Sequence, residues 1–136
     1  MSKSNYLENQ FLANLFNNSA LGYASDTTFY VALHSSDPGE AGDQTTNEIS
    51  YTGYARVGVA RNSGGFTVSG ATVTNTAQVQ FPICTGGTAT ATHFSIGRLA
   101  SGAGDIFYKG TLNSSLAISN NVQPQFAATA LSITED

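Results

Sequence analysis

Charged side chains are scarce in this chain of 136 residues. Only 10% of its residues are charged, against about 25% in an average domain, and the formal net charge is −4. The five basic residues are scattered along the sequence as Lys3, Arg56, Arg61, Arg98 and Lys109. Nucleic-acid binding needs a clustered basic surface, so we expect no nucleic-acid partner. Low net charge with 40% hydrophobic residues also argues against a disordered chain.

The sequence also has only one cysteine and no long apolar run. The one cysteine, Cys84, excludes an internal disulfide framework and a cysteine-rich metal site. No apolar run approaches the roughly 18 residues of a membrane-spanning helix, so we expect no membrane partner. The first residues, MSKSNYLENQ, lack the basic-then-apolar order of a signal peptide.

Neutral polar residues supply the missing polarity, with 15 Ser, 16 Thr, 11 Asn and 6 Gln. One stretch among them has helical periodicity. Leu7, Phe11 and Leu15 repeat every four residues, and Leu12 and Phe16 widen the apolar stripe. Either Ser4 or Asn5 can cap this helix, and Glu8 follows Asn5 at capping-box spacing. The asparagines and serine at 17–19 predict its end.

After residue 26 the apolar period changes from 3.6 to 2. The segment 27–34 is apolar on both faces, which is typical of a central strand. We predict a hairpin turn at 62–65, an alternating strand at 77–81 that Pro82 ends, a turn at 101–105, and final strands in NVQPQF and ALSIT. About eight short strands at close spacing predict a mainly β fold, a β-sandwich or jelly-roll-like domain with one N-terminal α-helix. We expect a single domain, 1–136, with a helical segment at 1–18 and the sandwich at 27–136.

The few reactive side chains of the sequence do not have the spacing of a catalytic site. His34 and His93 have no neighbour at metal-ligand spacing, and we interpret both as hydrogen-bonded strand residues. Ser35 and Ser36 follow His34 directly, but adjacent side chains of a strand point to opposite faces. Cys84 has no nearby cation to activate it and reads as a small buried hydrophobe.

An acidic loop is the most suggestive local feature, because Asp37, Glu40, Asp43 and Glu48 lie within 12 residues. Their spacing fits no EF-hand, so we interpret them as solvated loop charges. We therefore predict no catalytic residue, no metal and no cofactor, and a structural or binding protein in place of an enzyme.

Several segments taken together resemble a family of small virion proteins of tailed bacteriophages. Their order is NYLENQFLANLFNN, TTFYVALHSSDPGEAG, YARVGVA, VTNTAQVQFP, THFSIG and IFYKGTL. Asn75-Thr76-Ala77 with Phe81-Pro82, and Thr92-His93-Phe94, match two family elements. The chain departs from the family at Gly97-Arg98, where a Tyr-Asp pair is usual, and at 83–85. The resemblance covers nearly the whole chain and implies a structural virion role.

The family label alone does not separate a head protein from a tail protein. A fibre shaft is long and repetitive, and this sequence shows no repeat. We therefore expect a capsid decoration, or cement, protein on the head surface of the virion, made in the host cytoplasm. Its partners would be the major capsid protein and copies of itself.

Two alternatives follow from the same sequence. One is a tail or tail-fibre component. The other is a carbohydrate- or host-surface-binding module that uses exposed tyrosines as stacking platforms, with Tyr6, Tyr23, Tyr51, Tyr54 and Tyr108 as candidates.

The strongly apolar helix contrasts with the thin spread of hydrophobic residues elsewhere. We predict that Tyr6, Phe11 and Phe16 contact a neighbouring subunit or the capsid lattice. The alternative is that the helix only covers the domain's own sandwich.

Overall fold

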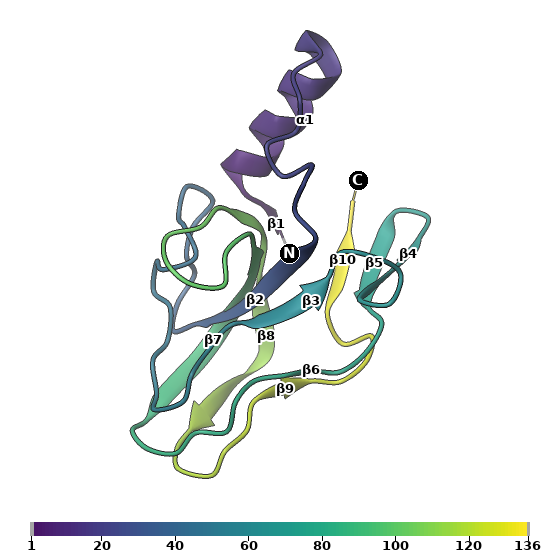
Figure 1. The fold of residues 1–136 in the computed structure, drawn as a ribbon. Coiled ribbons are helices and arrows are strands. Elements are labelled where there is room, and N and C mark those ends of the chain that lie inside the picture. The colour runs from purple at the N-terminus through teal and green to yellow at the C-terminus, as the bar shows by residue number, and fades with distance from the viewer. Residues whose placement is uncertain (1, 136) are drawn as a thin grey trace.

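A computed structural model describes residues 2–135 and shows mainly β structure with one helix in that range (Figure 1). The elements in chain order are β1 (Ser2–Lys3), α1 (Asn5–Asn17), β2 (Thr28–His34), β3 (Val57–Ala60), β4 (Phe66–Ser69), β5 (Thr72–Asn75), β6 (Val79–Gln80), β7 (Ala89–Gly97), β8 (Ile106–Ile118), β9 (Gln125–Phe126) and β10 (Ser132–Thr134). The main sheet has the order β1-β8-β7-β2-β3, and all its pairs are antiparallel.

Two smaller sheets, β10-β5-β4 and β6-β9, pack against the main sheet. Phe94 of β7 meets Phe126 of β9 with ring centroids 5.6 Å apart, and Phe29 of β2 meets Phe66 of β4 at 6.4 Å. Buried residues of all three sheets belong to one hydrophobic cluster. The predicted mainly β fold with a sandwich arrangement and one N-terminal helix is confirmed.

Strand β2 lies between β7 and β3, as its two apolar faces predicted. Val31, Ala32 and Leu33 are all at most 2% exposed. Neighbouring side chains of a strand point to opposite faces, so burial of all three requires cover on both sides of the sheet.

The predicted hairpin at 62–65 is wrong. The turn itself forms, because the Asn62 carbonyl accepts hydrogen bonds from the N–H groups of Gly65 and Phe66. However, β3 pairs with β2 in the main sheet, whereas β4 pairs with β5 in another. Beyond the turn, the Phe66 ring of β4 packs against Phe29 of β2.

The strand expected at 77–81 is shorter than its alternation suggested. Val79 and Phe81 are buried while Ala77 is exposed, but only Val79–Gln80 pairs as β6. Fragmentation of this kind produces ten strands among the described residues in place of about eight.

Helix α1 begins directly after β1. Ser4 is its N-cap, and the Ser4 hydroxyl accepts the N–H of Leu7 at 3.2 Å. The capping box expected between Asn5 and Glu8 is therefore wrong by one residue, since Asn5 is already helical. Asn18 ends the helix in the left-handed region (φ 53°), where its N–H binds the Ala13 carbonyl.

Candidate interaction surface

The first turns of α1 are anchored to the sandwich. Leu7 is 3% exposed and belongs to the core, and the Tyr6 ring lies 6.1 Å from that of Phe107. Arg98 holds this region together, because its guanidinium pairs with Asp26 at 2.7 Å and donates to the Tyr6 hydroxyl at 3.3 Å. These contacts fix the base of the helix to the loop before β2.

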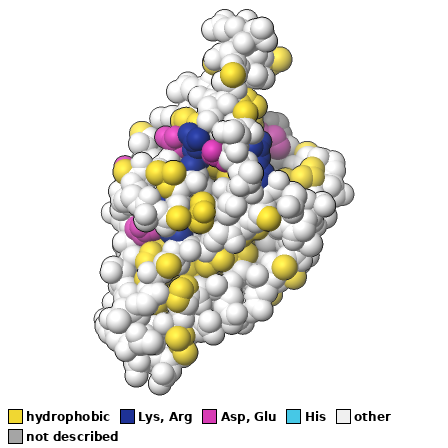
Figure 2. Space-filling view, viewed as in Figure 1, with side chains coloured by type: hydrophobic (Ala, Val, Ile, Leu, Met, Phe, Trp, Pro, Cys, Tyr) yellow, Lys and Arg dark blue, Asp and Glu magenta, His cyan; other side chains and the backbone are white. Residues whose placement is uncertain are grey.

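The rest of α1 stands away from the sandwich (Figure 1). We call Leu12, Leu15 and Phe16 the helix tip; they are 57%, 74% and 75% exposed, while Phe11, nearer the base, is 39% exposed. Figure 2 shows charged side chains gathered around the base of the helix and none on the visible face of its far end. Apolar side chains at such exposure are unusual for a helix in water, because the core-facing stripe is normally buried.

An apolar groove of about 570 Å³ lies beside the helix base. Its floor and walls come from α1, the main sheet and the β10-β5-β4 sheet, and we define it by Leu7, Phe11, Phe29, Phe107, Phe66, Val68, Val73 and Ile133. Val68 is 70% exposed on its outer wall. Figure 2 shows hydrophobic side chains lining hollows on this face of the molecule.

Two charged side chains line the groove, Arg61 and Glu135. The Arg61 guanidinium lies 5.2 Å from the Phe29 ring and donates to the carbonyls of Tyr23, Ala24 and Asp26. Glu135 binds Lys3 and the Tyr108 hydroxyl. These hydrogen bonds hold the pKa of the Glu135 carboxyl below its ordinary value. Both charges are therefore fixed in place at the rim.

The three predicted contact residues occupy different positions. Tyr6 packs on Phe107 of the main sheet, Phe11 lines the groove and is 39% exposed, and Phe16 is 75% exposed. Contact of these side chains with a partner stays a prediction. The sequence pattern did not separate the anchored half of the helix from the exposed half, because both carry the same apolar stripe.

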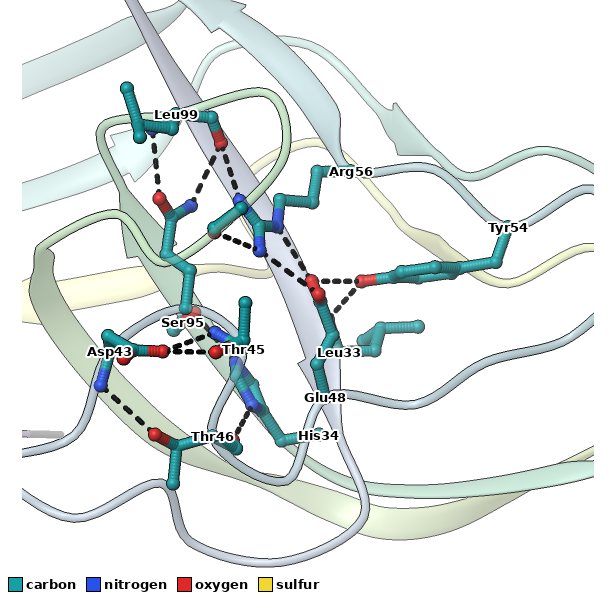
Figure 3. Close-up of polar contacts among 12 residues, drawn as sticks. Leu33, His34, Asp43, Thr45, Thr46, Glu48, Tyr54, Arg56, Ser95 and Leu99 are labelled. Atoms are coloured by element: carbon teal, nitrogen blue, oxygen red, sulfur yellow. Dashed lines mark hydrogen bonds and ion pairs between the residues drawn. The ribbon is translucent and has the colours of Figure 1, made fainter.

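A polar network ties the loop 35–56 to the main sheet (Figure 3). Arg56 and Glu48 form a two-point pair, with Nε–Oε2 at 2.7 Å and Nη2–Oε1 at 3.0 Å. Arg56 also donates to the carbonyls of Leu99 and Gly102. Its side chain is 2% exposed, so each donor facing the interior needs these partners.

Gln44 forms the other half of the network and is fully buried. Its amide donates to the Leu99 carbonyl at 3.2 Å and accepts the Leu99 N–H at 2.9 Å. A Cβ atom at Gly97 or Gly104 would lie 2.4 or 2.1 Å from Gln44 atoms. Glycine at these two positions is therefore what allows Gln44 to be buried.

His34 and Ser95 lie next to each other with the spacing of a base and a hydroxyl nucleophile. His34 Nε2 is 2.8 Å from Ser95 Oγ, and Nδ1 is 2.8 Å from the Thr46 carbonyl. A carbonyl only accepts, so Nδ1 carries the proton and Ser95 donates to Nε2. Both residues are 0% exposed, which keeps substrates away. Burial also lowers the pKa of the His34 imidazole, with the Thr46 hydrogen bond opposing it.

Ser95 was not predicted as a partner of His34, because the two residues lie 61 positions apart in the chain. The strand register is the signal that could have found the pair: Ala32 lies opposite Ser95 and His34 opposite His93. The interpretation of His34 as a hydrogen-bonded strand residue is confirmed, and so is the burial of Cys84 as a free thiol.

The acidic loop does not form a cluster. Glu48 turns inward to Arg56, so its interpretation as a solvated charge is wrong. Asp37 pairs with Lys109 at 3.0 Å, and Asp43 accepts the N–H of Thr45. Within residues 2–135 no group of three or more His, Cys, Asp and Glu side chains is placed to hold a metal ion.

The prediction of exposed tyrosines as sugar-stacking platforms is wrong, because none of the five is exposed. Tyr23 and Tyr51 are 8% and 7% exposed. Tyr6, Tyr54 and Tyr108 are half-buried, and the Tyr54 hydroxyl donates a hydrogen bond to the Glu48 carboxylate. Their apolar ring faces are used for packing inside the sandwich, which a pattern of isolated tyrosines could not reveal.

The fold and surface define a small β-sandwich protein with a bare apolar helix, an arrangement suited to assembly with other chains. The family described as Podophage GP4 fiber I protein gp80 matches residues 2–134, and the chain belongs to this family. The resemblance to small virion proteins of tailed phages is thereby confirmed. No curated protein sequence is significantly similar to the chain. Within the described residues no helix has the length and hydrophobicity to cross a membrane.

Proposed function

We propose that this virion protein is a tail-fibre component that is held in the phage particle through its helix tip. The observation that carries the proposal is the exposure of Leu12, Leu15 and Phe16 on a helix that leaves the sandwich. Contiguous apolar surface of this kind marks an interaction site in soluble proteins. The family description, which names a fibre protein, supports the placement in a fibre.

A second placement is the head surface, where the protein would act as a capsid decoration protein on the major capsid protein. The observation that favours it is the compact sandwich without a repetitive shaft, since the sequence has no internal repeat. Decoration works through many copies that each contribute a modest interface. The helix tip would supply that interface in either placement.

The two placements are separated by locating the protein in purified particles. Heads and tails are separated after disruption, and each fraction is analysed by mass spectrometry, with immunogold labelling of intact particles beside it. We expect the chain in the tail fraction. Recovery with the heads favours decoration, and absence from purified particles contradicts a virion role.

The role of the helix tip is tested with the variant Leu15→Asp in phage production. Deleting residues 1–18 is unsuitable, because Ser4 and Leu7 belong to the core. Ile83→Asp is the matched control, since Ile83 is another exposed apolar residue, at 42%, outside the helix and the groove. We expect Leu15→Asp to fold but be lost from particles, while Ile83→Asp is retained. Normal incorporation of Leu15→Asp would contradict attachment through the tip.

A further inference from the structure

The two ends of the sandwich differ in charge. The sequence has no Asp, Glu, Lys or Arg in the segments 62–92 and 110–134. These segments supply β6, β9, the start of β7 and the far half of β8, which form the end of the sandwich away from α1 (Figure 1). We call this the uncharged end. Figure 2 shows no charged side chain on the visible lower part of the molecule. A ligand at this end would be recognised through hydrogen bonds and apolar contacts.

A cleft of about 240 Å³ opens at the uncharged end, between β8 and β9. Leu33 and Phe81 line its inner part, and these side chains are 2% and 0% exposed. The half-buried ring of Phe126 also lines the cleft and lies against Phe94, with 5.6 Å between the ring centroids. The inner part of the cleft is therefore apolar and held in place by the core.

An irregularity of β8 forms the outer rim of the cleft. The register between β7 and β8 shifts between Ala91 and His93, so that residues 112–115 of β8 lie opposite the single residue Thr92. A bulge of this kind interrupts the ladder and redirects side chains. The side chains at 113–115, one amide and two hydroxyls, are exposed and line the cleft.

The polar groups of the rim are available to a ligand. Within residues 2–135 the side chains of Asn113, Ser114 and Ser115 make no hydrogen bond. Gln125 of β9 accepts a hydrogen bond from Gln78, which leaves its own amide N–H groups to donate. Among the described residues, none that lines the cleft is charged. The rim thus offers uncharged donors and acceptors around an apolar interior.

We infer that this cleft binds a neutral saccharide, with one sugar ring against the apolar interior and its hydroxyl groups on the amides and hydroxyls of the rim. A pyranose ring combines apolar C–H faces with hydroxyl groups that both donate and accept hydrogen bonds, which complements the cleft. The volume suits a single ring, since pockets for larger, drug-sized ligands measure about 300–1,000 Å³. None of the five tyrosines considered as stacking platforms lines this cleft.

The lack of charge selects among sugars. The carboxylate of a uronic or sialic acid would lose water at the cleft without a cationic partner, which is costly. A neutral sugar meets no such cost. The inference goes beyond the proposed attachment, because the cleft and the helix tip lie at opposite ends of the molecule (Figure 1).

An extended peptide is the competing occupant, and the strands beside the cleft argue against it. Strand addition needs a run of backbone N–H and C=O groups along a regular edge. At the cleft, β8 is irregular over 112–115, and β9 consists of Gln125–Phe126 alone. Neither strand offers a ladder of useful length there. Recognition therefore depends on the side chains of the rim, which suits a sugar.

The test begins with the full-length chain on an array of oligosaccharides built from neutral hexoses, deoxyhexoses and N-acetylhexosamines, with oligogalacturonates as anionic probes. The neutral probe that binds best is then titrated into the isotope-labelled chain and followed by NMR. We expect the side-chain amide signals of Asn113 and Gln125 to shift, while that of Asn120 stays in place. Oligogalacturonates should bind at least about 10-fold more weakly than the neutral probe.

Two variants locate the site. Asn113→Ala and Gln125→Ala each remove hydrogen bonds at the rim and should weaken binding of the neutral probe about 5- to 10-fold. Both residues are exposed, so circular dichroism should show a folded chain. Asn120→Ala is the matched control, because Asn120 is an exposed asparagine of the same uncharged end that does not line the cleft, and its affinity should be unchanged.

Several results would overturn the inference. One is the absence of binding of every neutral probe at about 10 mM. Others are equal or tighter binding of the oligogalacturonates, and full affinity in both Asn113→Ala and Gln125→Ala. An uncharged peptide of glycine, serine and asparagine is titrated in parallel. If the peptide shifts the cleft signals and no saccharide does, the cleft receives a protein segment and the saccharide is the wrong ligand.

Discussion

The loop 35–56 and the helix tip use their side chains in opposite ways. The loop is held through Glu48 and Arg56, which bind each other, and through Gln44 and Arg56, which donate to the Leu99 carbonyl. The tip exposes three large apolar side chains and carries no charged residue from 12 to 17. The loop buries a few polar side chains against internal partners, whereas the tip leaves its apolar surface uncovered.

The difference shows where a chain with few charges places them. Lys3, Arg56, Arg98 and Lys109 each pair with a carboxylate, and Arg61 binds three carbonyls. The basic residues thus connect loops and termini to the sheets. Without charges of its own, the tip meets little desolvation cost when another chain covers it.

The largest effect on stability is expected from breaking the Arg56–Glu48 pair. Arg56→Met removes one partner of a buried pair and leaves the Glu48 carboxylate without its guanidinium, which should cost about 3 kcal/mol or more of unfolding free energy. Chemical denaturation followed by circular dichroism measures it. The exposed pair provides the control: Lys109→Met leaves Asp37, 53% exposed, in water and should cost less than about 1 kcal/mol. Equal losses would contradict the structural role of the buried pair.

An intermediate effect on stability is expected from the same substitution in the two halves of the helix. Leu7→Ala should cost about 2–5 kcal/mol, because it opens a cavity in the core, while Leu15→Ala in dilute solution should cost less than about 0.5 kcal/mol. Both variants carry the same substitution on one helix, so differences in helix propensity cancel. If Leu15→Ala were as costly as Leu7→Ala in the monomer, the tip would be packed and the comparison would fail.

The smallest expected effect is the dependence of stability on pH. Burial keeps the pKa of His34 below its ordinary value, with Glu48 opposing this shift and Arg56 and His93 adding to it. The unfolded chain therefore binds a proton that the folded chain does not, so stability should fall as the pH decreases from about 6.5 toward the lower folded pKa.

Urea midpoints at pH 7.5 and 5.5 measure this dependence, and His34→Gln should reduce the difference between them. His93→Gln is the control: it removes only the last of the causes that lower the His34 pKa, so it should reduce the difference less than His34→Gln does. The carboxyl groups of Asp37 and Asp43 have lowered pKa values and act in a more acidic range, below about pH 4. A pH difference that survives in His34→Gln would assign the dependence to other groups.

The features that sequence predicted well depend on local periodicity. The helical stripe from Leu7 to Phe16 and the doubly apolar segment 27–34 led to α1 and β2 with nearly correct ends. The lack of a cation near Cys84 in the sequence led to the correct prediction that it is buried. In each case the deciding neighbours lie within a few residues.

The missed features depend on which segments meet in space. Glu48 and Arg56 have ordinary spacing in a loop, and only their approach to Leu99 and Gly102 makes them a buried pair. Strand β4 pairs with β5, and its Phe66 packs on Phe29, a contact between residues 37 positions apart. The exposure of the tip had no signal either, since an apolar stripe looks the same whether it is covered or bare.

The junction of β1 and α1 has a mechanical consequence. Ser4 alone separates the strand from the helix, and it is held by its N–H to the Phe107 carbonyl and by its hydroxyl to Leu7 and Ile106. No flexible linker lies between the two elements, so the direction of the helix is set by the sheet. A load applied to the far end of the helix would act through a rigid lever on β8, the longest strand. In a particle that must keep its shape, such a joint transmits force into the sandwich without yielding at a hinge.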